Sequence, residues 1–435
     1  MKKFFLILTL LFTAFSLTSC KKDDYVIKFS WWGTSDRNIA TYRVIELFNE
    51  KYPEYKILGD GTAWSGYQAS LNNQLHRGTE ADIFQVNYNW IYQMYGIDYF
   101  MDIKELGIDF SKYPEEEHKP LTVEGKVLAL SASETGYILY LNKKVYDDAG
   151  ITEIPKTWSD LIEAGKTISS KTPGKYAIGR LDAQQVAILI FAYLGQKTGK
   201  NVISNDNKLN FTLAELEEGF NFIDTLRSNG VLIPSNSEDT YNEGFSNPNW
   251  TTHQNYGGVL TWNTAISEYE NTLPSGSELI TAGFPQINLG EKLGMYKKVS
   301  MGFAVSKRVE KSDLKKAAVK TFLEFITTDP EAVLILGVDR GISSHADTQA
   351  MLKDSKDHDF TKTNEWLGHE IVQDYYNNQL SLGQKLYIHP YYEHDTFRKI
   401  YEDQIEKFLR GTATGREAAQ RIINNFNKEL ERVME

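Results

Sequence analysis

The segment that decides the fold runs from residue 25 to residue 86 and reads YVIKFSWWGTSDRNIATYRVIELFNEKYPEYKILGDGTAWSGYQASLNNQLHRGTEADIFQV. Its apolar residues alternate with polar ones where a strand is expected and recur every three to four residues where a helix is expected. Gly78 and Pro53 stop the two helical patterns. Strands are therefore expected at residues 25–31, 55–58 and 81–86, with helices at 36–52 and 67–77. This alternation predicts a parallel sheet with helical connections.

The same alternation continues to the carboxyl end of the chain. Strands are expected at residues 127–130, 136–141, 176–179, 257–261 and 299–305. Helices are expected to begin at Thr157 and Ser312, and at two capping boxes, Thr212 to Glu215 and Thr414 to Glu417. The fold class predicted from this pattern is α/β, in two lobes.

Length and charge limit the classes of function. The chain has 435 residues, which suits two or three domains, and 41% of them are hydrophobic, as in a globular protein. A formal net charge of −11 disfavours nucleic acid as a partner. The single cysteine, Cys20, excludes an internal disulfide and a cysteine-based zinc site.

The first twenty residues resemble a secretion signal. Lys2 and Lys3 precede an apolar run at residues 4–15 that is too short to span a bilayer. Leu17-Thr18-Ser19-Cys20 resembles a bacterial lipobox. We expect a signal peptide at residues 1–19, a lipid on Cys20 and a short tether at 20–24, so that the mature protein is anchored outside the cytoplasm. The alternative is a plain signal peptide with an incidental cysteine.

Aromatic side chains combined with amides or charged groups follow most of the predicted strands. Ligands of open parallel sheets bind beyond the carboxyl ends of the strands. Flat rings stack on the C–H faces of sugars, and amide, carboxylate or guanidinium groups bind sugar hydroxyls. We therefore expect a carbohydrate site. The candidate residues are Trp31, Trp32, Asp36, Trp64, Asn87, Tyr88, Glu134, Asp182, Trp262, Asn263 and Arg340.

Each candidate has a structural alternative. Trp31 and Trp32 point to opposite faces of their strand, so at most one is expected in the core. Asn87 and Tyr88 also fit a turn, Glu134 and Asp182 could cap helices or pair with lysine, and Arg340 could form a surface ion pair. His389, Glu393, His394 and Asp395 form a rival metal site, but Pro390 opposes the helix this would need. We expect no metal and no cofactor.

At this point the chain resembles the family 1 extracellular solute-binding proteins of ABC importers, the class that includes maltose-binding-like receptors. The resemblance covers the mature chain in order. It rests on Asp82-Ile83-Phe84, Glu124-Gly125-Lys126, Pro155-Lys156-Thr157-Trp158, Gly257 to Trp262, and the helical segments 316–329 and 411–430. Ser131, where the family often has proline, and Leu141, where tyrosine is usual, depart from its pattern.

The resemblance implies two lobes joined by a hinge, with the ligand in a cleft between them. It places lobe 1 at residues 25–132 and 286–345, and lobe 2 at 133–285 and 346–435. It implies a monomeric, non-catalytic receptor that passes its sugar to ABC permease subunits served by a cytoplasmic ATPase. Two alternatives remain open at this stage, a surface hydrolase or lyase acting on a glycan and a receptor of the same fold for a non-sugar solute.

Overall fold

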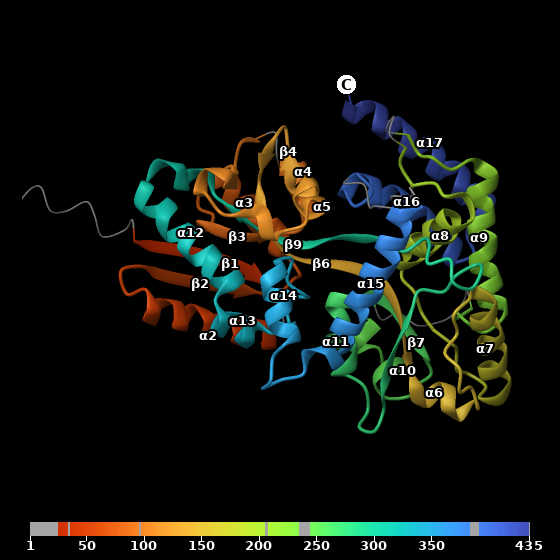
Figure 1. The fold of residues 1–435 in the computed structure, drawn as a ribbon. Helices are drawn as coiled ribbons and strands as arrows, with labels where there is room; N and C mark the ends of the chain where they lie inside the picture. Colours follow the sequence, from red (N-terminus) through yellow and green to blue (C-terminus); the bar gives the residue numbers. More distant parts are fainter. Residues whose placement is uncertain are drawn as a thin grey trace, which may run out of the picture. The chain divides into compact units, whose positions relative to one another are not determined.

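The computed structural model describes residues 25–33, 35–94, 97–204, 208–234, 244–382 and 391–434. The chain forms two compact units (Figure 1): unit 1 contains the described residues up to Ala132 and Met301–Asp354, and unit 2 contains Ser133–Ser300 and the described residues from Ser355 onward. The chain thus passes from unit 2 to unit 1 after Ser300 and returns to unit 2 after Asp354, whereas the lobe bounds implied by the resemblance place these passages after residues 285 and 345. The signal and tether expected at residues 1–24, Cys20 included, lie outside the described residues.

The sheet of unit 1 combines parallel strands with one antiparallel strand. β1 (Val26–Trp32) is paired in parallel with β2 (Lys56–Thr62) and with β3 (Ile83–Val86). α2 (Ser35–Lys51) and α3 (Tyr67–Arg77) connect these strands. The alternation predicted for residues 25–86 is confirmed. β9 (Lys297–Val305), which crosses from unit 2, pairs antiparallel with β3.

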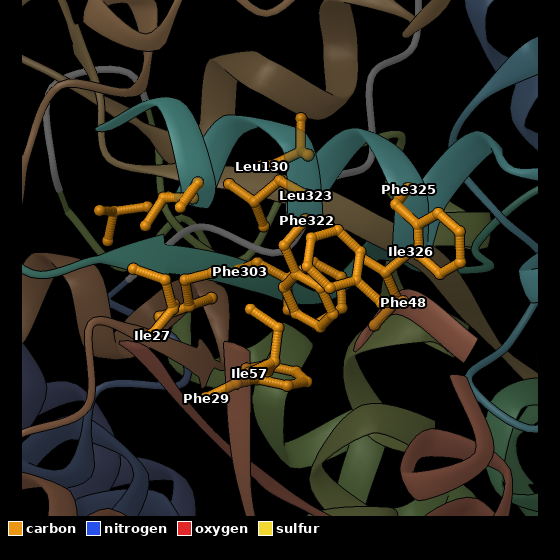
Figure 2. Packing of buried hydrophobic residues seen from close by; sticks show 14 of the residues in the cluster. Ile27, Phe29, Phe48, Ile57, Leu130, Phe303, Phe322, Leu323, Phe325 and Ile326 are labelled. Carbon is orange, nitrogen blue, oxygen red and sulfur yellow. The ribbon is translucent and has the colours of Figure 1, made fainter. Parts of the chain in front are cut away.

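Aromatic rings fill the core of unit 1 between the sheet, α2 and α12 (Asp313–Thr328). Figure 2 shows Phe29 of β1 near Phe303 of β9 and Phe322 of α12, at centroid distances of 5.6 and 5.4 Å. Phe48 of α2 lies 5.1 Å from Phe322. Each such contact adds about 0.5–1.5 kcal/mol beyond the burial of apolar area. This packing fixes the direction in which the strand ends point.

The remaining elements of unit 1 are short. The helices are α4 (Tyr88–Met94), α5 (Glu115–His118), α13 (Pro330–Leu336) and α14 (Ala346–Lys353). The strands β4 (Thr122–Val123) and β5 (Lys126–Val127) form a separate antiparallel pair. Single 3-10 turns occur at Ile103–Leu106, Phe110–Lys112, Lys119–Leu121 and Lys307–Lys311.

The sheet of unit 2 is antiparallel, which differs from the expected parallel pattern. β6 (Ala129–Asn142) begins in unit 1 and pairs in unit 2 with β7 (Gly258–Trp262) and β8 (Leu279–Gly283), antiparallel in both cases. The chain between β6 and β7 carries helices α6 to α10. A connection of that length can return in either direction, so the alternation of elements did not determine the sense of pairing.

Helices make up most of unit 2. They are α6 (Lys143–Asp148), α7 (Trp158–Lys171), α8 (Ala183–Thr198), α9 (Leu213–Ser228), α10 (Pro248–Thr251), α11 (Ile266–Glu270), α15 (Asn364–Ser381), α16 (Asp395–Leu409) and α17 (Gly415–Met434). Single 3-10 turns lie at Gly244–Ser246, Asn263–Ala265 and Phe360–Lys362. The capping boxes predicted at Thr212 and Thr414 are confirmed. The strand expected at 176–179 is present only as isolated bridges, Tyr176 with Tyr256 and Gly179 with Leu232.

Candidate functional site

Three tryptophans gather at the carboxyl ends of the parallel strands of unit 1. Trp32 ends β1, Trp64 follows β2, and Trp90 lies in α4 just after β3. The centroid of the Trp32 ring is 5.0 Å from that of Trp64 and 5.2 Å from that of Trp90, and Trp64 stacks on Trp90 at 5.5 Å. Trp32 and Trp90 are buried, whereas Trp64 is 54% exposed. We call these three residues the tryptophan platform; it presents one indole to solvent on a base of two fixed indoles.

Tyr67, the first residue of α3, holds the platform in place. Its ring centroid lies 5.3 Å from that of Trp32, and its hydroxyl group contacts the carbonyl oxygens of Ser30 and Gln85 at 3.2 and 3.0 Å. Burial raises the pKa of the Tyr67 hydroxyl far above its usual value, so this group stays protonated and can donate. Tyr67 thereby links α3 to the ends of β1 and β3.

Trp31 and Arg340 lie inside unit 1. The Trp31 side chain is fully buried, and its Nε1 donates to Asn38 Oδ1 at 2.9 Å. Only a glycine fits above this ring, because a Cβ at Gly61 would come within 2.7 Å of it. Both adjacent tryptophans are buried, which differs from the expectation that at most one would be: Trp31 belongs to the apolar core cluster of unit 1, and Trp32 is covered by the other rings of the platform.

Arg340 is buried beside the strand ends. Its guanidinium donates to Gln85 Oε1 and, at 2.5 Å, to Thr41 Oγ1. Burial lowers the pKa of this guanidinium to about 9, since the charged form loses its hydration. In this structure the N–H groups of Arg340 thus form hydrogen bonds inside unit 1, where they link β3 to α2.

The other candidates of unit 1 differ in exposure. Asp36 is exposed in the first turn of α2, and Tyr88 is buried at the start of α4. Asn87, between β3 and α4, is half-buried. Among the described residues, no group donates a hydrogen bond to its buried Oδ1. Asn87 therefore offers an acceptor close in sequence to Trp90.

Trp262 is the aromatic residue at the end of β7 in unit 2. It is half-buried and lies opposite Tyr137 in the β6–β7 register, with ring centroids 4.6 Å apart. Lys298 Nζ lies 4.3 Å from the centroid of the indole, a cation–π arrangement. The carboxylate of Glu393 accepts from the same ammonium group at 2.6 and 2.7 Å. The cation on this ring is therefore neutralised within unit 2.

Asn263 and Glu134 have buried partners. Asn263 Oδ1 accepts from the backbone of Gly136 at 2.9 Å and from Thr135 Oγ1 at 3.0 Å, which joins the end of β7 to β6. Glu134 pairs with Lys297, and its Oε1 is 3.7 Å from His369 Nδ1. Burial lowers the pKa of His369, so its imidazole is neutral at pH 7. Both residues brace β6 in this structure.

A pocket of about 180 Å³ opens in unit 2 near the amino end of α8. Asp182 caps α8, accepting from the backbone of Gln185 at 2.7 Å, and both side chains line the pocket. Aromatic and polar residues share the wall: Arg180, Phe245, Asn247, Trp250, Tyr256, Thr261, Glu268 and Tyr269. The pocket thus pairs flat rings with hydrogen-bonding groups inside a single unit.

Sequence reasoning missed several of these residues. Trp90 and Tyr67 complete the platform, and Gln185 and Tyr269 line the pocket. Trp90 could have been predicted as a site residue from the sequence, because it lies just after the third strand, in the same kind of position as Trp32 at the end of the first strand and Trp64 after the second. No sequence pattern marked Tyr67 as a site residue, since a tyrosine at the start of a helix is normally a packing residue.

The described residues contain no group of three or more histidine, cysteine, aspartate or glutamate side chains placed to hold a metal ion. Of the rival metal site, His389 lies outside the described residues, Glu393 pairs with Lys298, and His394 Nδ1 accepts from the backbone of Thr396. In the part of the chain covered by the structure, no helix has the length and apolar character needed to cross a membrane.

Comparison with known proteins gives the class. A family model described as bacterial extracellular solute-binding protein matches residues 43–356. The chain belongs to this family, as the sequence predicted, and the family places it outside the cytoplasm. Its α/β, periplasmic-binding-protein-like fold class is likewise confirmed by the solved structures it resembles.

The individual relatives share only part of their length or about a quarter of their residues with this chain. The diacetylchitobiose binding protein DasA of Streptomyces coelicolor is 30% identical over 151 residues, which span 33% of this chain and only 35% of DasA. An oligogalacturonide binding protein of Yersinia enterocolitica, solved with saturated digalacturonic acid, has a TM-score of 0.80 at 24% identity, covering 94% of this chain and 100% of that one. A periplasmic solute binding protein of Pectobacterium atrosepticum has a TM-score of 0.82 at 24% identity, with the same coverage.

Proposed function

We propose that the protein binds a carbohydrate outside the cytoplasm and delivers it to an ABC importer. The observation that carries this proposal is the tryptophan platform, with the indole of Trp64 54% exposed on a base of two buried indoles. An indole exposed at the end of parallel strands gains binding free energy when a ligand removes its apolar surface from water. The C–H face of a pyranose ring fits that requirement.

Unit 2 supplies a second set of sugar-type contacts. Trp262 is half-buried at the end of β7, and the pocket beside α8 combines Tyr256 and Tyr269 with Gln185 and Asp182. Hydroxyl groups of a sugar need such amide and carboxylate partners. We propose that this pocket is a sugar-binding surface of unit 2, as the tryptophan platform is of unit 1. The named ligands of DasA and of the Yersinia protein, both carbohydrates, support this assignment.

The remaining partners belong to the same proposal. The sugar passes to permease subunits that an ATPase in the cytoplasm drives, and this chain itself catalyses nothing. A lipid on Cys20 anchors the monomer to the membrane. Mass spectrometry of the mature protein tests the anchor, with a diacylglyceryl cysteine as the expected first residue. An unmodified Cys20 in the mature protein would show that the proposed lipid anchor is wrong.

Titration calorimetry with a sugar panel tests the binding function. The panel holds neutral and acidic oligosaccharides, with a polyamine and a peptide mixture as non-sugar ligands. At least one oligosaccharide is expected to bind, and to bind more weakly to Trp64→Ala. Tight binding of a peptide or polyamine with no response to any sugar would favour the non-sugar receptor. Turnover of a bound oligosaccharide would favour the glycan-degrading enzyme.

A further inference from the structure

β8 in unit 2 has one side without a strand partner. It pairs with β6, and among the described residues no other strand pairs with it. The backbone of Lys143 donates to the Glu278 carbonyl at 2.9 Å, and Leu141 lies opposite Ile280. In an antiparallel ladder the next residues on either side then direct their main-chain groups away from the partner. Leu279 and Thr281 therefore present N–H and C=O groups along the outer edge of β8.

This edge lacks charged side chains and proline. Proteins normally guard an open strand edge with lysine, proline or another charged side chain. The strand reads Leu279-Ile280-Thr281-Ala282-Gly283, with no charge and no proline. A strand of this composition is typical of an edge that is covered by another segment.

α15 borders the same edge and turns it into a groove of about 510 Å³. The apolar lining comes from Leu279 and Ile280 of β8 and from Leu367 and Ile371 of α15. Leu367 is 39% exposed, which is high for a leucine beside a sheet. Thr281 Oγ1 donates to Asn364 Oδ1 at 2.7 Å and fixes α15 relative to β8. The groove therefore has an apolar wall next to a row of main-chain hydrogen-bonding groups.

The charged groups of the groove are all acidic. Glu278, Glu370 and Asp374 line it, and among the described residues no lysine, arginine or histidine does. Asp374 pairs with Lys292 at 2.7 Å, but that pair is exposed and therefore contributes little free energy. Lys143 interacts electrostatically with Glu278, but its ammonium group pairs with Asp147. Glu370 accepts a hydrogen bond from Trp366 Nε1 at 3.1 Å, which leaves its charge in place. The groove is therefore complementary to positive charge.

We propose that this groove binds an extended, cationic segment of another protein, which adds to β8 as a further strand. Apolar residues of the segment contact Leu367 and Ile371, and its lysines or arginines face Glu278 and Glu370. The main-chain pairing supplies affinity and the acidic rim selects for charge. This docking surface lies within unit 2 and does not depend on the sugar proposal.

Three labelled heptapeptides test the proposal on the purified protein at low salt, where surface charges are least screened. The first alternates lysine with valine, the second replaces lysine by glutamate, and the third is the lysine peptide with its central valine changed to proline. Fluorescence anisotropy is expected to show the tightest binding for the first peptide and none for the glutamate peptide. The proline peptide lacks a central N–H donor and is expected to bind about tenfold more weakly or worse. Hydrogen exchange at Leu279 and Thr281 should slow with the lysine peptide.

Charge-reversal variants distinguish binding in the groove from general charge attraction. The pair Glu278→Lys with Glu370→Lys is expected to weaken binding of the lysine peptide about tenfold or more. The control pair, Glu163→Lys with Asp224→Lys, makes the same charge change on α7 and α9 and should leave binding unchanged. Failure of the lysine peptide to bind, equal binding of the proline peptide, or equal losses in both variant pairs would each overturn the proposal. Sugar titrations of both pairs should match the unmodified protein.

Discussion

At the scale of single residues, exposure separates the aromatic side chains that can meet a ligand from those that build the fold. Trp31 and Trp32 are neighbours in the chain. The Trp31 ring packs against the backbone at Gly59 and Gly61, whereas the Trp32 ring contacts Trp64. Trp64 itself contributes little to the core, because more than half of its surface lies in solvent. A substitution there should act on binding far more than on folding.

We predict that Trp64→Ala weakens sugar binding about tenfold or more, because roughly 1.5–2 kcal/mol of ring contact is lost. The melting temperature should fall modestly as well, because the contacts of Trp64 with Trp32 and Trp90 are lost. Ile97→Ala is the matched control, since Ile97 is also 54% exposed in unit 1. Calorimetry with the best sugar of the panel measures the effect. Equal affinities for the two variants would remove Trp64 from the site.

At the scale of elements, several helices of unit 2 begin at side-chain caps. Thr212 Oγ1 accepts from the backbone N–H of Glu215, whose carboxylate accepts in return from the backbone of Thr212 at 2.8 Å. The same reciprocal pairing begins α7 at Thr157 and α8 at Asp182. These local bonds satisfy backbone donors that a helix cannot satisfy itself.

Thr212→Ala is expected to destabilise unit 2 by about 1 kcal/mol through loss of the cap of α9. Thr225→Ala, within the same helix and exposed, is the control and should be neutral or slightly stabilising, because alanine is the better helix former. Chemical denaturation followed by circular dichroism measures both. A Thr212→Ala protein as stable as the control would contradict a stabilising role for the cap.

α16 carries a carboxyl group with a shifted pKa. Burial, reinforced by the nearby Asp182 and Glu406, raises the pKa of Glu402 from 4.5 to about 7, although Arg398 acts in the opposite direction. A raised pKa means that the folded state favours the protonated acid. The stability that this preference contributes is complete below pH 4.5 and is lost as the pH rises through about 7.

Glu402→Gln mimics the protonated acid, so we predict that it gains stability over the unmodified protein above pH 7, by about 1–2 kcal/mol after allowance for partial solvent screening. Near pH 5 the two proteins should melt alike. Glu431→Gln, an exposed position on α17, serves as control. Melting temperatures across this range decide the matter; a difference independent of pH would argue against titration of Glu402.

At the scale of the whole molecule, buried tyrosines occur in both units. Burial raises the pKa of Tyr113 to about 12 in unit 1, and it raises those of Tyr137, Tyr140, Tyr392 and Tyr401 in unit 2 well above the usual value. All of them favour the protonated phenol in the folded state. Their contribution to stability is present below pH 10, the ordinary tyrosine value, and is lost above it.

We predict that the protein unfolds cooperatively between the ordinary tyrosine pKa and the pKa values of the buried phenols. Phenolate absorbance and circular dichroism should change together in an alkaline titration, because the buried phenols ionise only on unfolding. Phenolate formation at those groups without loss of ellipticity would show that they are accessible to solvent.

Local sequence patterns determined the elements and the family of this protein. The periodicity of residues 25–86, the capping boxes and the glycine stops act over a few residues, so the strands and helices of unit 1 could be predicted from them. The quoted motifs likewise indicated the extracellular solute-binding family. The strand pattern also indicated that Trp31 and Trp32 point to opposite faces of β1, but not that both are buried.

Contacts between distant segments decided the rest. The antiparallel pairing of β6 with β7 and β8, the burial of Arg340 against Gln85 and Thr41, and the grouping of Trp90 with Trp32 and Trp64 each join residues far apart in the chain. A side chain's exposure is set by what packs over it, and no local pattern carries that information. For this reason the sequence determined which residue types lie at the strand ends, while only the tertiary structure decided which of them remain open to a ligand.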